Sequence, residues 1–301
     1  MEFQYTGRII KEFRTRKKLS QEKLAELCLC SVTTISRIET GIQLPSRSLV
    51  DMIFQKLGYT SNANSALTTN VEFQRYLIEK QMSTLVSQGN HDIADLLNDY
   101  NGIAKDMTVL EKQTYLFYSA VYDTEHEVSA EKVLAKYNEA LNLTFEDYWK
   151  IQRSKERDIY LTQNELLIIS NIAIEKYSLG KADEAISIME DLKEYYKKNF
   201  VDEKEIEKHF AVVLLSLGNW YDDKGEQEKA LEMCEQGILY CSKAALPSFI
   251  VNKGYCLYKM GNKEEGISMV KDGAKLLAYL HQEERLKIVK QHTKQFFGID
   301  I

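Results

Sequence analysis

The stretch "LSQEKLAELCLCSVTTISRIETG", residues 19–41, sets the fold class at the start of the chain. Its apolar residues recur at helical spacing in two runs: Leu24, Ala25 and Leu27, then Ile35 and Ile38. Such spacing indicates amphipathic helices. A serine, Ser20 or Ser31, precedes each run and is a preferred helix N-cap. The stretch therefore predicts two short helices, at 21–28 and 32–39, joined by a tight turn.

The flanking residues extend this pattern to a small helical domain. Upstream, Ile9, Ile10 and Phe13 share one face of an expected helix at 6–17. Gly41 closes the helix at 32–39, because glycine is favoured just past a helix end. Downstream, Pro45 stands near the start of a further helix whose apolar stripe is Leu49, Ile53 and Leu57. Four helices are thus readable, and we expect a helix-turn-helix domain of the five-helix type.

The second helix of the pair has a polar outer face, which a DNA major groove admits. The letters "SQEKLA" at 20–25, "S" at 31, "TIS" at 34–36 and "ETG" at 39–41 resemble the Cro/repressor-type helix-turn-helix. The resemblance implies that Gln21 contacts a phosphate and that Arg37 reads a guanine edge. It implies the following groove-facing residues: Ser31, Val32, Thr33, Ser36 and Arg37.

The same resemblance assigns a scaffold role and marks one departure. Arg14 and Glu39 occupy the positions of a structural ion pair in that family. Leu29 stands in the turn where the family usually has glycine, a residue that adopts left-handed backbone angles without strain. We therefore expect a strained or differently bent turn at Leu29.

Charge is divided unevenly along the chain. Residues 1–60 hold ten Lys and Arg against six Asp and Glu, although the whole chain of 301 residues has a net charge of −6. A basic head on an acidic body places any contact with nucleic acid at the N-terminus. Backbone contacts without base information are expected from Arg8, Lys11, Lys17 and Lys18.

Composition and missing motifs narrow the functional class. Apolar residues make up 44% of the chain, and only 2 prolines and 14 glycines occur, which favours an all-α protein with a sizeable core. We expect a cytoplasmic protein without a signal peptide or membrane partner. The five cysteines and five histidines form no metal-ligand spacing, and no nucleotide-binding or hydrolase motif occurs. No enzyme activity, metal or cofactor is expected.

Internal repeats follow the polar segment "YTSNANSALTTN" at 59–70. "LGNWYDDKGEQEKALEMCEQGILY" at 217–240 and "KGYCLYKMGNKEEGISMVKDGAKLL" at 253–277 align with a period of 36, so that Gly225 matches Gly261 and Gly218 matches Gly254. An earlier copy surrounds Gly180, and two weaker copies lie near Gly89 and before Thr144. Glycines between helices make turns, and small residues within helices permit close packing.

This pattern resembles the tetratricopeptide repeat. The resemblance predicts an α-solenoid of about five repeats with a capping helix at 276–297. The expected domains are a DNA-binding domain at 1–66 and a repeat domain at 67–301. A superhelix of helix pairs has a concave groove in which side-chain amides can bind an extended peptide. The expected groove residues are Gln163, Asn164, Asn171, Asn219, Asn252 and Lys253.

Taken together, the order of parts is similar to the peptide-responsive quorum-sensing regulators of the Rgg/PlcR/PrgX type. That resemblance implies a homodimeric transcription factor that binds a double-stranded DNA operator and responds to a short signalling peptide. Two alternatives remain open from the residues alone. In the first, the repeats bind a protein partner instead of a peptide; in the second, the chain is an adaptor that no longer reads DNA.

Overall fold

The computed structural model describes residues 7, 10, 11, 13–15, 17–57, 70–87, 89–103, 107–126, 128–146, 148–150, 161–198, 209–240 and 243–301. The regular elements in this part of the chain are all helices, which confirms the expected all-α class. The chain divides into two compact units, Met1–Gly180 and Lys181–Ile301.

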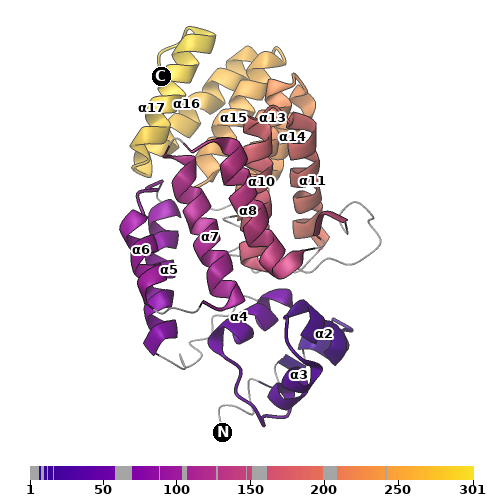
Figure 1. Cartoon of the computed structure of the whole chain (residues 1–301). Helices are drawn as coiled ribbons and strands as arrows, with labels where there is room; N and C mark the ends of the chain where they lie inside the picture. Colours follow the sequence, from indigo (N-terminus) through magenta and orange to yellow (C-terminus); the bar gives the residue numbers. More distant parts are fainter. Residues whose placement is uncertain are drawn as a thin grey trace. The chain divides into compact units, whose positions relative to one another are not determined.

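The first unit begins with the head, by which we mean the described residues from Gly7 to Leu57 (Figure 1). Residues 10, 11 and 13–15 are helical, at the place of the expected first helix. The other helices of the head are α2 (Gln21–Leu27), α3 (Val32–Glu39) and α4 (Arg47–Lys56). The rest of the unit consists of α5 (Asn70–Ser87), α6 (Ala94–Gly102), α7 (Val109–Thr124), α8 (Ala130–Phe145) and α10 (Gln163–Ser178). Within the described residues, α5 packs on α6, α6 on α7, α7 on α8 and α8 on α10.

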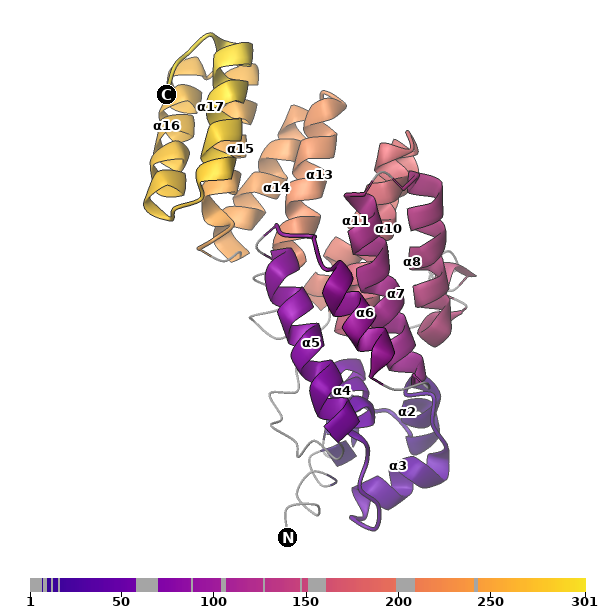
Figure 2. The same cartoon turned by 60° about the vertical axis from the view of Figure 1, so that its left-hand side comes forward.

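The second unit, taken by itself, is also a succession of packed helices. Its elements are α11 (Ala182–Lys198), α13 (Ala211–Asp223), α14 (Gln227–Tyr240), α15 (Leu246–Lys259), α16 (Lys263–Tyr279) and α17 (Glu283–Phe297). Figure 2 shows α17 beside the pair formed by α15 and α16. Helices α13 and α14 correspond to one repeat found in the sequence, and α15 and α16 correspond to the next.

The aligned glycines perform the two roles that their spacing predicts. Gly225 and Gly261 have φ angles of 75° and 100°, so each adopts the left-handed conformation in the turn of its pair. Gly254 on α15 and Gly266 on α16 face each other where the two helices cross. A Cβ atom on either one would lie 2.6 Å from the carbonyl oxygen of the other. The absence of side chains at both positions therefore lets the two backbones approach this closely.

Two repeat helices begin with a capping box, which the sequence analysis did not identify. In the first, Thr108 accepts a hydrogen bond from the Glu111 backbone, and the Glu111 side chain accepts one from the Thr108 backbone. In the second, Thr162 and Glu165 form the same reciprocal pair at the start of α10. Each box satisfies backbone N–H groups that have no partner inside the helix.

The expected capping helix at 276–297 is shorter than predicted. Helix α16 continues to Tyr279, and α17 begins only at Glu283. The chain turns at His281, whose φ angle is 55°, and its backbone N–H donates to the carbonyl of Ala278. Leu276 and Leu277 therefore belong to α16, and Ile288, one of the apolar residues of the expected capping helix, is 63% exposed on α17.

The boundary expected between residues 66 and 67 lies outside the described residues, as does Cys241. Three of the described cysteines, Cys28, Cys234 and Cys256, are buried free thiols, and Cys30 is a half-buried one. In the part of the chain that the structure describes, every helix is too short or too polar to cross a membrane.

Candidate DNA-reading surface and repeat face

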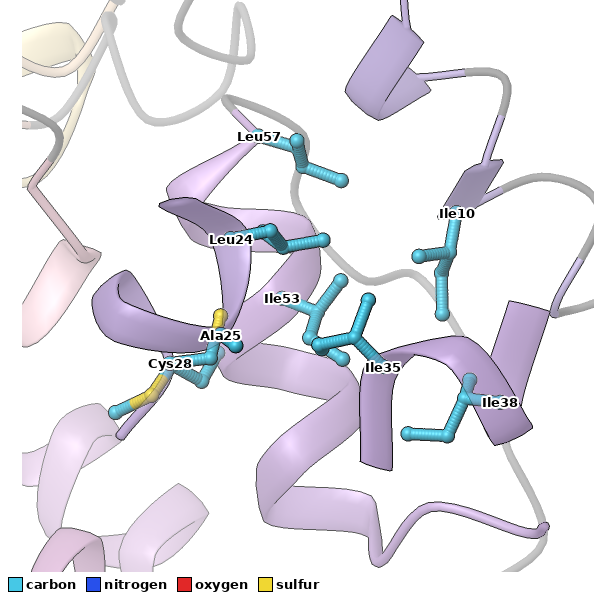
Figure 3. Close-up of a cluster of buried hydrophobic side chains, with 9 residues drawn as sticks. Ile10, Leu24, Ala25, Cys28, Ile35, Ile38, Ile53 and Leu57 are labelled. Carbon is cyan, nitrogen blue, oxygen red and sulfur yellow. The ribbon is translucent and has the colours of Figure 1, made fainter. Parts of the chain in front are cut away.

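The head is held together by one apolar cluster to which all its helices contribute (Figure 3). Its buried members are Ile10, Leu24, Ala25, Cys28, Ile35, Ile38, Met52, Ile53 and Leu57. These include both apolar runs of residues 19–41 and the predicted stripe of α4, apart from Leu27 and Leu49, which are half-buried. The core thus fixes α3 against α2 and α4.

Serine side chains define where the head helices begin. Ser20 accepts a hydrogen bond from the Lys23 backbone at 3.1 Å, and Ser31 accepts one from the Thr34 backbone at 3.0 Å. These bonds confirm both predicted caps. Ser46 caps α4 in the same way, so α4 starts two residues after Pro45. Each cap satisfies one of the free N–H groups of its helix.

The turn between α2 and α3 adopts left-handed geometry without a glycine. Leu29 has a φ angle of 50° and its side chain is 53% exposed. The Cys30 backbone donates to the carbonyl of Ala25 at 3.0 Å, which is the bond that closes a helix ending in a left-handed residue. The expected strain at Leu29 is therefore present, since the Cβ atom of a residue other than glycine makes this conformation cost about 1–2 kcal/mol.

A network around Glu39 supports the entry to α2. Arg14 donates to both carboxylate oxygens of Glu39, at 2.6 and 3.0 Å, and also to the carbonyl of Leu19 at 2.7 Å. The hydrogen bond with Glu39 raises the pKa of the Arg14 guanidinium. The predicted scaffold ion pair is thus confirmed. A third donor was missed: Gln21 Nε2 donates to Glu39 Oε2 at 2.7 Å, so the ion pair also orients Gln21.

The predicted reading face lies on one exposed side of α3. We use this name for Ser31, Val32, Thr33, Ser36 and Arg37. Four of them are exposed and Ser36 is half-buried. The carbonyl of Arg37 accepts hydrogen bonds from the backbones of Ile42 and Gln43, which ties the following loop to the end of α3. The contacts of these five residues and of Gln21 with DNA remain predictions.

Of the basic residues expected to contact the DNA backbone, Lys11 and Lys18 are exposed and Lys17 is half-buried. Burial lowers the pKa of Lys17. Arg8 lies outside the described residues.

The expected groove residues of the first unit all lie on α10, where each has a protein partner. Gln163 donates its backbone N–H to Gln55 of the head at 2.8 Å. Asn164 Nδ2 donates to Thr114 Oγ1 at 3.1 Å, and Asn171 Nδ2 donates to the carbonyl of Leu167 at 2.8 Å. The N-terminal end of α10 is therefore bound to the head and to α7.

In the second unit, Asn219 and Asn252 form a polar ladder between α13 and α15. Asn252 Nδ2 donates to Asn219 Oδ1 at 2.9 Å. Lys253 points to another helix, since its Nζ atom lies 2.8 Å from Glu235 on α14. Lys259 and Asp222 add an ion pair at 2.6 Å to the ladder. The sequence could have indicated this ion pair through helical spacing. Asp222 lies three residues after Asn219 on α13, and Lys259 lies seven residues after Asn252 on α15, so each is on the same helix face as its asparagine.

A hollow of about 690 Å³ lies between α5 and α6 of the first unit. None of the expected groove residues lines it; its walls are Leu77, Lys80, Gln81, Thr84, Leu85, Asp92, Ile93, Asp95 and Leu96. Among the described residues, no three metal-ligating side chains converge. A role for Gln163, Asn164, Asn171, Asn219, Asn252 and Lys253 in binding a peptide remains a prediction.

Comparison with known proteins gives a family match for the N-terminal domain and structural matches for nearly the whole chain. A helix-turn-helix family model matches residues 10–62. No curated protein sequence matches the chain. PlcR from Bacillus thuringiensis, solved with the peptide PapR7 and DNA, is 18% identical, with a TM-score of 0.62 over 95% of this chain and 99% of that one.

Two further solved structures share this architecture. PlcR without ligands is 16% identical, with a TM-score of 0.57 over 95% of this chain and 98% of that one. The competence regulator ComR from Streptococcus vestibularis, in its apo form, is 17% identical, with a TM-score of 0.54 over 97% and 98%. Residues 10–62 therefore form a helix-turn-helix domain, and the chain has the helical-repeat fold of PlcR and ComR.

Proposed function

We propose that the chain is a cytoplasmic transcriptional regulator that binds operator DNA as a homodimer and responds to a short peptide. The observation that carries this proposal is the reading face, four of whose five residues are exposed and four of whose five are polar, on a helix held by a buried core. A helix of this kind fits the major groove. The match of nearly the whole chain to PlcR, a protein solved with a peptide and DNA, supports the proposal.

The first-helix face of the repeats is the proposed peptide site. Asn171 on α10, and Asn219 with Asn252 in the second unit, are amides on the first helices of their pairs. An amide side chain has a donor and an acceptor, and an extended peptide backbone needs both. The peptide would bias operator binding through different affinities for two arrangements of the dimer.

DNA binding at the promoter of its own gene tests the proposal. Fluorescence anisotropy with labelled promoter duplex is measured at a stated salt concentration, with and without peptides encoded by short reading frames beside the gene. We expect specific binding that one such peptide changes. Binding that no peptide alters, but that a second protein shifts, would favour a protein partner for the repeats. No binding above that of a scrambled duplex would favour an adaptor.

Two variants sharpen the DNA half of this test. Arg37→Ala should weaken specific binding by about 1–3 kcal/mol without changing the melting temperature, because it removes a base contact. Lys290→Ala on α17, which also removes an exposed positive charge, is the matched control and should bind as the wild type does. Equal specific affinity for the Arg37 variant and the wild type would contradict the assigned reading role.

A further inference from the structure

A buried ion pair joins the head to the repeats within the first unit. Lys56, the last residue of α4, and Glu165, in the first turn of α10, lie 2.6 Å apart between Nζ and Oε2. Their side chains are 2% and 0% exposed. A buried charge is tolerated when it is paired and hydrogen-bonded, so each side chain depends on the other. The two elements are therefore held in one relative position by charge as well as by packing.

Hydrogen bonds carry this contact on to two further helices. Glu165 Oε1 accepts a hydrogen bond from Thr144 Oγ1 of α8 at 2.8 Å. Thr144 Oγ1 in turn accepts one from Gln113 Nε2 of α7 at 2.6 Å. The Lys56 ammonium also lies over the Phe145 ring, 5.5 Å from its centroid. The head is thus fixed to α7, α8 and α10 together.

The head also completes the N-terminus of α10. Gln55 Oε1 accepts the hydrogen bond from the Gln163 backbone, the first N–H group of that helix. The capping box satisfies two further N–H groups at this end, those of Thr162 and Glu165. Because one glutamate both caps α10 and binds Lys56, a displacement of the start of α10 displaces the end of α4 as well.

The core of the head connects α4 to the reading face. Leu57 directly follows Lys56, and Ile53 lies three residues before it; both belong to the same buried cluster as Ile35 of α3 (Figure 3). Close-packed cores transmit displacements because they contain few voids. A movement of α4 is therefore passed on to α3, which carries the reading face.

Resting on the proposed function, we infer that Lys56 and Glu165 are positioning residues that couple α10 to the orientation of the DNA-reading helix. Helix α10 carries the joint at one end and Asn171, an expected peptide contact, further along. A peptide bound at Asn171 would therefore contact the same helix to which the DNA head is joined. We call the contact of Lys56, Glu165, Thr144, Gln113, Gln55 and Gln163 the joint.

The joint is tested in the full chain with the double variant Lys56→Met, Glu165→Gln. Glutamine keeps the capping box, and removal of both charges leaves none buried alone. The matched control is Arg75→Met, Glu111→Gln, which makes the same changes in the buried ion pair between α5 and α7. Noncanonical amino acids that carry spin labels replace Gln43 in the head and Lys132 on α8, and the distance between the labels reports the position of the head relative to the repeat helices.

We expect a single narrow distance distribution for the wild type and the control variant, and a broad one for the joint variant. A narrow distribution for the joint variant would overturn the inference. A broad one for both variants would also overturn it, since it would show general loosening. If the joint double variant does not fold, Lys56→Gln with Glu165→Gln, which removes both charges but keeps a hydrogen-bonding side chain at each position, is measured instead, and an unchanged narrow distribution there overturns the inference.

A second readout concerns DNA and separates this inference from the proposed function. A fixed head restricts the spacing of half-sites that a dimer tolerates. We expect the wild type and the control to lose affinity when single base pairs are inserted between half-sites, and the joint variant to lose less. An equal loss for the joint variant contradicts coupling. Failure of all three proteins to bind specifically contradicts the proposed function and leaves the distance measurement decisive for the joint.

Discussion

Among the described residues of the first unit, two ion pairs share one design, a glutamate in a threonine capping box, and they differ in where the cation comes from. Glu111 of α7 and Glu165 of α10 each stand at the third position of a helix that starts with a threonine capping box. Glu111 receives Arg75 from α5 at 2.7 Å, whereas Glu165 receives Lys56 from the head at 2.6 Å. Each cation also lies 5.5 Å from the centroid of an aromatic ring.

The difference shows how one local device serves two purposes. At α7 the pair joins two repeat helices, so it stabilises packing between neighbours of the same kind. At α10 the pair joins a repeat helix to a separate small domain, so it sets the position of that domain. Glu111 is 13% exposed and Glu165 is 0% exposed, and the head contact is thus the more completely dehydrated of the two.

The largest effect is expected from breaking the head contact on one side only. Lys56→Met leaves the Glu165 carboxylate buried without its cation and should lower the free energy of unfolding by about 3–5 kcal/mol. Denaturant unfolding of the full chain followed by circular dichroism measures this. The double variant with Glu165→Gln should recover most of the loss. A double variant as unstable as the single one would mean that packing, rather than the isolated charge, accounts for the effect.

Arg75→Met should cost less than the Lys56 change. In the Arg75→Met variant, the Glu111 carboxylate stays partly exposed to solvent and keeps its hydrogen bonds with Thr108. The expected loss in the free energy of unfolding is therefore about 1.5–3 kcal/mol, the range for a hydrogen bond to a charged group. The same unfolding experiment gives the comparison. A larger loss of unfolding free energy for Arg75→Met than for Lys56→Met would contradict the expectation that the head contact is the more sensitive of the two ion pairs.

Acid should weaken the α7 pair. Burial raises the pKa of Glu111, but hydrogen bonds from Arg75 and Thr108 outweigh it and hold the pKa below the ordinary value of 4.5. The stability that Glu111 contributes is thus complete above pH 4.5 and is lost as the pH falls through its lowered pKa. The difference in unfolding free energy between wild type and Glu111→Gln should shrink below pH 4.5. A difference that does not change with pH would contradict this.

Leu29→Gly should have the smallest effect and the opposite sign. It relieves the left-handed strain but adds freedom to the unfolded chain, so a gain of about 0.5 kcal/mol is expected. With the joint intact, calorimetry should show this gain in the transition of the whole first unit. In the variant with Lys56→Met and Glu165→Gln, the gain should be confined to the head. A loss of stability on Leu29→Gly would show that the exposed leucine makes a stabilising contact.

Sequence patterns predicted the parts of the fold that depend on local physics. The caps at Ser20 and Ser31 follow from side-chain preferences, and the turns at Gly225 and Gly261 follow from backbone freedom. The contact of Arg14 with Glu39 was available from the family resemblance.

The joint could not be predicted because its partners are 109 residues apart in sequence. At the end of an amphipathic helix, Lys56 is indistinguishable from a solvated lysine that interacts with the helix dipole. Gln163 and Asn164 were assigned to the groove because they lie near Asn171 on the same expected helix, and nothing in the sequence indicated their hydrogen bonds with Gln55 and Thr114. The end of α16 was missed because apolar residues stand on both sides of the turn at His281, leucines 276, 277 and 280 before it and Leu286 and Val289 after it, so that the sequence shows no break in the pattern.

The crossing of Gly254 and Gly266 has a consequence for how this chain can change in evolution. Each position excludes a side chain by itself, because a Cβ there would meet the backbone carbonyl of the opposite residue, which every amino acid carries. A substitution at one position therefore cannot be compensated by a substitution at the other. Both positions are restricted to glycine independently, and sequence drift in this pair of helices is confined to the surfaces away from their crossing.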